Sequence, residues 1–414
     1  MKSGALLLVA VASLAWGQSS PNPRFLNGQL IHASTDQRIQ AYQHLLTSSP
    51  DDLRLETGLI SAYLQKLRES ADFTYLDRAA KLVDRMLEKD GGNFTALRFQ
   101  NEIDLQRHEF RAVAARAQDM ARYAPSDPGN WGNLGDAFME LGDYERAGQA
   151  YSRMFALRPN LGSYNRLAYF RFVTGDAPAA IEWMRDAVAA GDPFPQNVAW
   201  CWAELGDMYF KTGKLAEADG AYRSAIALFP TLHRASAGLA KVAAARGDLP
   251  AAIRHYERAQ SIVPLVEYAG ALEDLYTAAG MPAKARKQRE LIATIETLGK
   301  ANNEKTNRNL ALTLADHNRD LALALQLMET EIPARGDVYT WDAYSWVLFK
   351  TGRLEQARDA SRKALKLGTP EPVFYYHAGK IALALADEKS RREYFDRLAS
   401  LNARFDFAKV SQGN

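Results

Sequence analysis

The chain has 414 residues, and 47% of them are apolar or aromatic, which is enough to bury a large core. Its 51 basic and 49 acidic residues leave a formal net charge of +2, so composition indicates neither a nucleic-acid ligand nor an anionic membrane surface. The single cysteine, Cys201, excludes an intramolecular disulfide, and we expect it to be a small buried apolar residue.

The N-terminus has the layout of a secretory signal peptide. Lys2 supplies a positive charge, an apolar run extends from Ala5 to Trp16, and the small residues Ala15 and Gly17 precede Gln18. This order is typical of export signals, and the run is short for a membrane span. We predict that residues 1–17 are cleaved and that the mature chain is exported, to the periplasm or the extracellular space. A retained membrane anchor is the alternative.

Helical hairpins are expected downstream, because glycines recur at intervals of about 34 residues. A glycine tolerates the left-handed conformation that ends one helix, and a following aspartate is a good N-cap for the next. Asn318 stands where one member of the series is missing. The glycines are Gly142, Gly175, Gly213, Gly247, Gly280 and Gly352, and aspartate follows three of them, at Asp143, Asp176 and Asp248.

Apolar residues around these turns have the spacing of one helix face, and their pattern resembles the tetratricopeptide repeat family. The family signature is W-x2-L-G-x2-Y in a first helix, A-x3-F in a second helix, and a closing proline. The unit from Trp131 to Pro159 follows this signature closely. The best match consists of Trp202, Leu205, Gly206, Tyr209, Ala218, Tyr222 and Pro230.

The resemblance implies an all-α fold, an α-solenoid of about ten tetratricopeptide-like helical hairpins stacked into a right-handed superhelix. We expect a signal peptide at residues 1–17 and an irregular segment with a capping helix at residues 18–52. The N-terminal part of the array would cover residues 53–299, and the C-terminal part, with its own capping helix, residues 300–414. The polar stretch from Gly299 to Lys305 would separate the two parts.

No motif for catalysis, phosphate binding or metal binding stands out. The seven histidines lack metal-ligand spacing, and there is no glycine-rich phosphate loop and no nucleophile motif. We therefore predict a non-catalytic scaffold without cofactor or metal. Its partner would be a protein or peptide and not a nucleic acid, with no stable membrane insertion after signal cleavage. A structural spacer in an envelope assembly, or an enzyme with a site on the inner surface, is the alternative.

In the resembling family, the concave face binds extended or helical peptides, so the inner face of each first helix is the candidate site. Aromatic anchors with interspersed polar groups suit peptide binding. The alternative is that these aromatic residues only pack beneath the superhelix. The same face near the C-terminus also carries Tyr339, Asp342, Phe349, Tyr376 and Lys380. The predicted groove residues are Asp136, Asn165, Tyr169, Phe172, Trp200, Asp207, Phe210 and Trp346.

Overall fold

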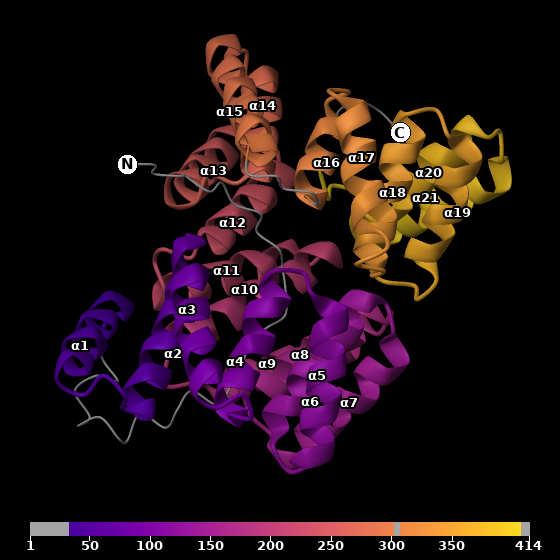
Figure 1. The fold of residues 1–414 in the computed structure, drawn as a ribbon. Helices are drawn as coiled ribbons and strands as arrows, with labels where there is room; N and C mark the ends of the chain where they lie inside the picture. The colour runs from indigo at the N-terminus through magenta and orange to yellow at the C-terminus, as the bar shows by residue number, and fades with distance from the viewer. Residues whose placement is uncertain (1–32, 302–306, 407–414) are drawn as a thin grey trace.

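A computed structural model describes residues 33–301 and 307–406, and within these ranges the secondary structure is entirely helical (Figure 1). The first eleven helices are α1 (Thr35–Ser48), α2 (Leu53–Ser70), α3 (Thr74–Lys89), α4 (Phe94–Gln106), α5 (Phe110–Tyr123), α6 (Pro128–Leu141), α7 (Tyr144–Leu157), α8 (Leu161–Val173), α9 (Ala177–Ala190), α10 (Pro195–Lys211) and α11 (Leu215–Leu228). The others are α12 (His233–Ala245), α13 (Leu249–Ile262), α14 (Val266–Ala278), α15 (Pro282–Ala301), α16 (Arg308–Asp316), α17 (Leu321–Glu331), α18 (Val338–Lys350), α19 (Leu354–Leu365), α20 (Pro372–Ala384) and α21 (Glu388–Asn402).

After α1, the helices of the described ranges pair as ten successive hairpins, from α2–α3 to α20–α21. The predicted all-α solenoid of helical hairpins is confirmed. The predicted signal peptide lies outside the described residues. The helix α15 continues to Ala301, so it runs past the boundary predicted between residues 299 and 300. No helix in the described part of the chain is both long and apolar enough to cross a membrane.

The hairpin turns follow from the glycine and aspartate positions. Gly213 ends the turn after α10 with φ of +77°, a left-handed conformation that costs glycine little. Asp143 caps α7 by accepting a hydrogen bond from the Arg146 amide at 3.1 Å. Asn318, at the place where the glycine series is interrupted, also has positive φ, at +51°. These local signals therefore set where each helix ends and the next begins.

Small residues allow the two helices of a hairpin to pack closely. A Cβ added at Gly206 of α10 would lie 2.6 Å from the Tyr222 ring of α11, so the glycine leaves the space that the tyrosine fills. Tyr151 of α7 fills the corresponding space at Gly135 of α6. Ala218, on α11, is fully buried. The signature residues thus form the core between paired helices, and the hairpins must stack to cover it.

The stack is wound so tightly that hairpins about 194 residues apart touch. The Val338 amide donates to the Tyr144 hydroxyl, Thr369 donates to the Val173 carbonyl, and Asn402 donates to the Phe210 carbonyl. Their separations are 194, 196 and 192 residues, a nearly constant register. We call this contact the seam. It joins residues 140–144, 173–175 and 210–213 to residues 335–338, 367–369 and 401–402.

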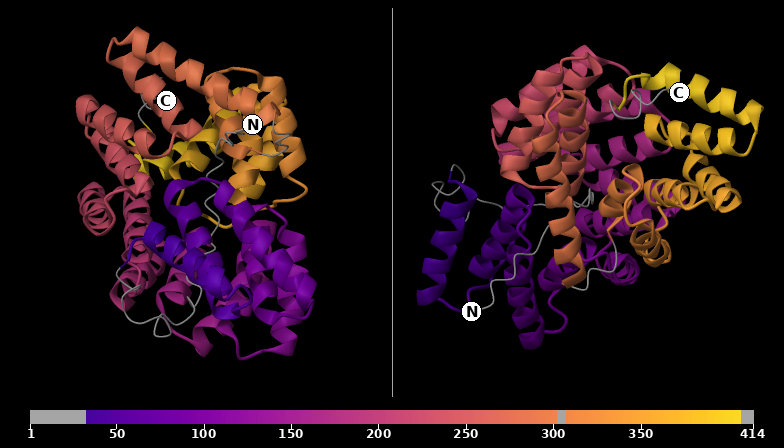
Figure 2. Two further views of the ribbon diagram at one scale, coloured as in Figure 1. Left: turned by 60° about the vertical axis from the view of Figure 1, so that its left-hand side comes forward. Right: turned by 90° about the horizontal axis from the view of Figure 1, so that it is seen from above.

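The seam brings the C-terminal hairpins beside the central ones. Figures 1 and 2 show the orange and yellow helices α16–α21 against the magenta central hairpins, where a straight stack would carry them away. Val338 and Phe374 are buried in one apolar cluster with residues of α4–α8. Arg335 is buried between Glu140 across the seam and Asp337 beside it, at 2.5 and 3.0 Å. The superhelix therefore closes around a central space.

Candidate functional site

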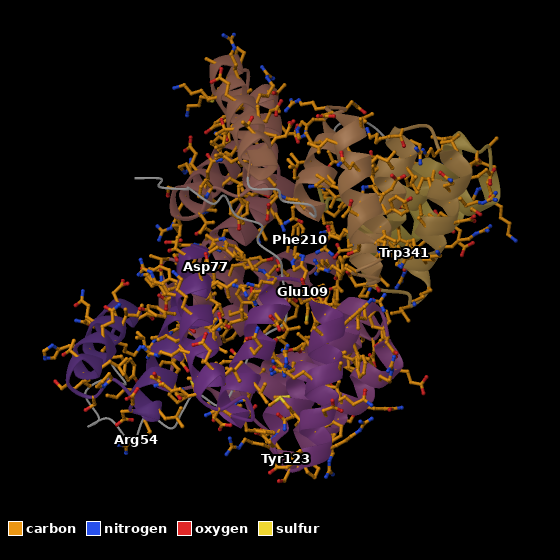
Figure 3. All side chains as sticks on the ribbon, viewed as in Figure 1. Arg54, Asp77, Glu109, Tyr123, Phe210 and Trp341 are labelled. Atoms are coloured by element: carbon orange, nitrogen blue, oxygen red, sulfur yellow. The ribbon has the colours of Figure 1, made fainter. Side chains whose placement is uncertain are left out.

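The central space is a cavity of about 980 Å³. Most of its lining comes from the first helices of six consecutive hairpins, α10, α12, α14, α16, α18 and α20. Further lining residues come from the ends of α2 and α4, from α13 and from the segment after α21. Figure 3 labels Phe210 of α10 near the centre of the molecule, in contrast to the exposed Tyr123 at its edge. The inner face of the array thus surrounds a central cavity that is partly open to solvent.

Aromatic and charged side chains dominate the lining. Ten of its residues are phenylalanine, tyrosine or tryptophan, and acidic and basic residues occur in equal number, seven each. A lining without net charge does not select a partner by the sign of its charge. It offers apolar contact area and directional polar groups, the combination found at the centre of protein interfaces.

Asp207 links three helices at the α10 wall. It accepts hydrogen bonds from the Tyr222 hydroxyl of α11 at 2.5 Å and from Arg234 Nη2 of α12 at 2.5 Å. Burial opposes the charge on Asp207, but Arg234 and two nearby lysines hold the pKa of this carboxyl well below its usual range. The Arg234 guanidinium also covers the Trp200 ring, with 4.5 Å to the ring centroid. This part of the wall is therefore preorganised and charged.

Lys211 connects the cavity wall to the seam. Its ammonium group is 2.7 Å from Glu371 Oε2, in the loop before α20. The same group lies over the rings of Phe172 and Tyr339, 5.4 and 5.5 Å from their centroids. Burial opposes its charge, but Glu371 and Asp207 raise the pKa of Lys211 above its usual value. The lysine is charged, and it ties α8, α10 and α18 together.

The α18 and α20 wall is an aromatic stack with polar partners. Trp346 donates from Nε1 to Asp316 Oδ1 at 2.8 Å, and its ring stacks on His377 at 4.1 Å. His377 Nδ1 lies 3.0 Å from Asp342 Oδ2. The Lys350 ammonium covers the Trp346 ring at 4.9 Å. His377 was not predicted as a site residue, although it follows Asp342 by 35 residues, about one repeat, on the next first helix.

No groove residue was predicted on α12 or α14, although both helices line the cavity. His233 of α12 and Tyr268 of α14 form a hydrogen bond of 2.8 Å. Burial and the neighbouring arginine lower the pKa of His233 to about 4, so its ring is neutral at pH 7. Burial raises the pKa of Glu267 to about 7, although Lys241 favours its charged form. These walls therefore add neutral or weakly charged polar groups beside the basic residues Arg234 and Lys241 of α12.

The eight predicted groove residues separate into two sets. Trp200, Asp207, Phe210 and Trp346 line the cavity, whereas the other four do not. Asp136 is buried and forms an ion pair with Arg166, whose Nε and Nη2 atoms donate to the two carboxylate oxygens at 2.9 and 2.7 Å.

Tyr169 and Phe172 belong to the helix that reaches the seam. Tyr169 packs against the apolar cluster that spans the seam, and Phe172 is buried beneath Lys211. Asn165 is 1% exposed, and neither its amide nitrogen nor its amide oxygen has a partner in the described residues. The inner helix face therefore changes role along the array, from ion pairs and seam contacts in α6 and α8 to cavity lining from α10 onwards.

Among residues 33–301 and 307–406, no group of three or more histidine, cysteine, aspartate and glutamate side chains is arranged to hold a metal ion. Cys201 is fully buried, and burial raises the pKa of its thiol, which disfavours the reactive thiolate.

Comparison with known proteins gives no curated sequence that matches the chain. Similar solved structures include MamA, which is 25% identical with a TM-score of 0.35 and covers 41% of this chain and 97% of its own. PilW, a widely conserved type IV pilus biogenesis factor, is 17% identical with a TM-score of 0.42 and covers 54% and 99%. The human IFIT1 dimer with PPP-AAAA is 13% identical with a TM-score of 0.47 and covers 89% and 87%.

The family comparison concerns the central hairpins. The family described as Tetratricopeptide repeat matches residues 93–161, 133–197 and 203–269. These are the hairpins from α4–α5 to α12–α13 and the start of α14, where the signature glycines, alanines and tyrosines pack as described above. Over these residues the chain matches the tetratricopeptide repeat family in both sequence and hairpin packing.

Proposed function

We propose that this protein is an exported, non-catalytic scaffold that binds a polypeptide in its central cavity. Tetratricopeptide repeats generally serve as protein-interaction scaffolds, and stacked hairpins present the continuous inner surface used for this purpose. The observation that carries the proposal is the 980 Å³ cavity, most of whose lining comes from six consecutive first helices. Its aromatic residues supply apolar contact, and its paired acids and bases supply fixed hydrogen-bonding positions for a peptide.

The binding is tested with short random peptides displayed on phage and selected against the full-length protein. A selected peptide, labelled with a fluorophore, is then titrated with cavity variants. Leu383→Asp and Phe349→Ala change two lining residues. We expect each to weaken binding by about tenfold or more, the range of interface hot spots.

A matched control separates the cavity from the rest of the surface. Leu228 is 42% exposed, close to the 51% of Leu383, but it does not line the cavity. Leu228→Asp should leave the affinity of the selected peptide unchanged. Equal losses in the two leucine variants, or no enrichment of any peptide, would contradict the proposal.

The export part of the proposal rests on the sequence of residues 1–17 and has its own test. Intact mass measurement of the native protein from the cell envelope fraction should give a chain that begins near Gln18. A chain that retains Met1 and fractionates with the cytoplasm would overturn export without affecting the binding proposal.

A further inference from the structure

We infer that the partner enters the cavity lengthwise, as an unfolded polypeptide segment with a free end, because the seam keeps the superhelix from opening sideways. The inference rests on the proposed function for the binding itself. The closure that it requires is a property of this chain alone and can be tested without any partner.

The first observation is the fit of successive hairpin turns across the seam. A Cβ added at Gly175 would lie 2.7 Å from the Leu367 carbonyl oxygen, and one at Gly213 would lie 2.6 Å from the Leu401 carbonyl oxygen. One at Gly142 would overlap the Gly336 carbonyl group. Real Cβ atoms do not approach backbone oxygens so closely, so glycine is required at all three positions. The seam is therefore built into the sequence at three consecutive hairpins.

The second observation is what holds the seam together. Its bonds use backbone groups, as when the Gly336 amide donates to the Glu140 carbonyl at 3.0 Å. Arg335 is buried together with Glu140 and Glu331. Separating the two sides would leave buried charges without their partners, which is strongly destabilising. It would also expose the apolar side chain of Phe374, which is 1% exposed in the closed chain. Sideways opening is accordingly disfavoured.

The third observation is where the cavity meets solvent. Among all the residues that line it, three are exposed, namely Lys241 of α12 and Leu383 and Ala384 of α20. A folded domain of about 75 residues has a radius of gyration of about 11 Å, far too large for a cavity of 980 Å³. An unfolded chain is narrow enough to pass. The cavity therefore has room for an unfolded chain segment but not for a folded domain.

The test places a thiol in the cavity and compares two reagents. Ala271, on the α14 wall, is changed by Ala271→Cys in a Cys201→Ala background. The full-length variant is treated with a maleimide on linear polyethylene glycol, or with a maleimide on a folded domain of similar mass. We expect the folded-domain reagent to react about a hundredfold more slowly than the polyethylene glycol reagent. This factor corresponds to a free energy of about 3 kcal/mol for opening the seam.

An exposed thiol provides the control for intrinsic reagent rates. Glu145 lies on the exposed face of α7, so Glu145→Cys should react with both reagents at similar rates. If the ratio of rates at Ala271→Cys equals that at Glu145→Cys, the seam opens readily and the inference is overturned. Should circular dichroism show that Ala271→Cys does not fold, Ala237→Cys provides a second position on the cavity wall.

Hydrogen exchange gives an independent measurement on the unmodified protein. The Gly336 and Val338 amides, both bonded across the seam, should exchange as slowly as amides in the middle of α11. Exchange about a hundredfold faster would mean that the seam opens while the hairpins stay folded. Loss of closure in these tests would reject lengthwise access and leave peptide binding intact, whereas failure of the peptide selection would reject the proposed function and leave the closure intact.

Discussion

Gly213 and Gly352 occupy equivalent hairpin turns and have the same φ of +77°, but their surroundings differ completely. A Cβ at Gly213 would collide with the backbone of Leu401, whereas one at Gly352 would meet nothing within 4 Å. The first turn faces the next superhelical turn across the seam, and the second faces solvent. One local motif therefore serves two purposes, and only the winding of the whole array determines which turns form the seam.

Alanine substitution at the two glycines should give the largest difference. Both variants force an alanine into the left-handed region, which costs about 1–2 kcal/mol. Gly213→Ala must also displace the carbonyl of Leu401, so we expect a total loss of about 3 kcal/mol or more. The free energy of unfolding, measured by urea denaturation, gives both values. Equal losses at Gly213 and Gly352 would show that the seam does not constrain its turns.

Buried charge gives a second contrast. Arg335 at the seam lies 2.5 Å from a carboxylate oxygen of Glu140, whereas Glu102 Oε1 on α4 is buried and has no hydrogen-bond partner among the described residues. Burial raises the pKa of Glu102 to about 7. Because the folded protein then holds a proton that the unfolded chain has lost, stability falls as pH rises from about 4.5 to about 7. Glu102→Gln should remove this loss and stabilise the protein at pH 8 by about 2–3 kcal/mol.

The measurement is urea denaturation of wild type and variant at pH 5 and pH 8. The advantage of Glu102→Gln should be larger at pH 8, because the wild-type carboxyl is charged there and the glutamine is not. The exposed Glu145→Gln on α7 is the control and should show no such difference. An advantage that is the same at both pH values would mean that Glu102 does not titrate between them.

Packing between the two helices of one hairpin can be tested at Ala218. This alanine is fully buried on α11, where a larger side chain would force the paired helices apart. Ala218→Leu should cost about 2 kcal/mol by overpacking. Ala216→Leu, on the exposed face of the same helix, should cost less than about 0.5 kcal/mol. An unchanged melting temperature for Ala218→Leu would place Ala218 outside the tight contact.

The hairpins could be predicted from the sequence because their signals are local. Gly206, Ala218 and Tyr222 lie within one unit, and their spacing reports the packing of one helix on its partner. The seam could not be predicted, because it depends on small rotations between hairpins that accumulate over about 194 residues. For the same reason, the sequence pattern placed Asp136 and Asp207 on one inner face, but it could not show that they differ. Asp136 forms a buried ion pair with Arg166, whereas Asp207 lines the cavity.

The smallest expected effect separates a single seam hydrogen bond from an equivalent bond within one helix. Thr369 is fully buried, and its hydroxyl donates to the Val173 carbonyl across the seam at 2.5 Å. Thr351 is partly buried, and its hydroxyl donates to the Val347 carbonyl of its own helix at 3.0 Å. Valine has nearly the shape of threonine and replaces the hydroxyl group with a methyl group, so each substitution removes the hydrogen bond. Thr369→Val should cost about 1–2 kcal/mol, because the Val173 carbonyl loses a partner in a buried place. Thr351→Val should cost less, about 0.5 kcal/mol, since water can reach that helix end.

Urea denaturation measures the loss of stability in both variants, and exchange of the Val338 amide should become faster only in Thr369→Val. If both variants lose the same stability and the Val338 amide is unaffected, the hydrogen bond at Thr369 contributes nothing specific to the seam.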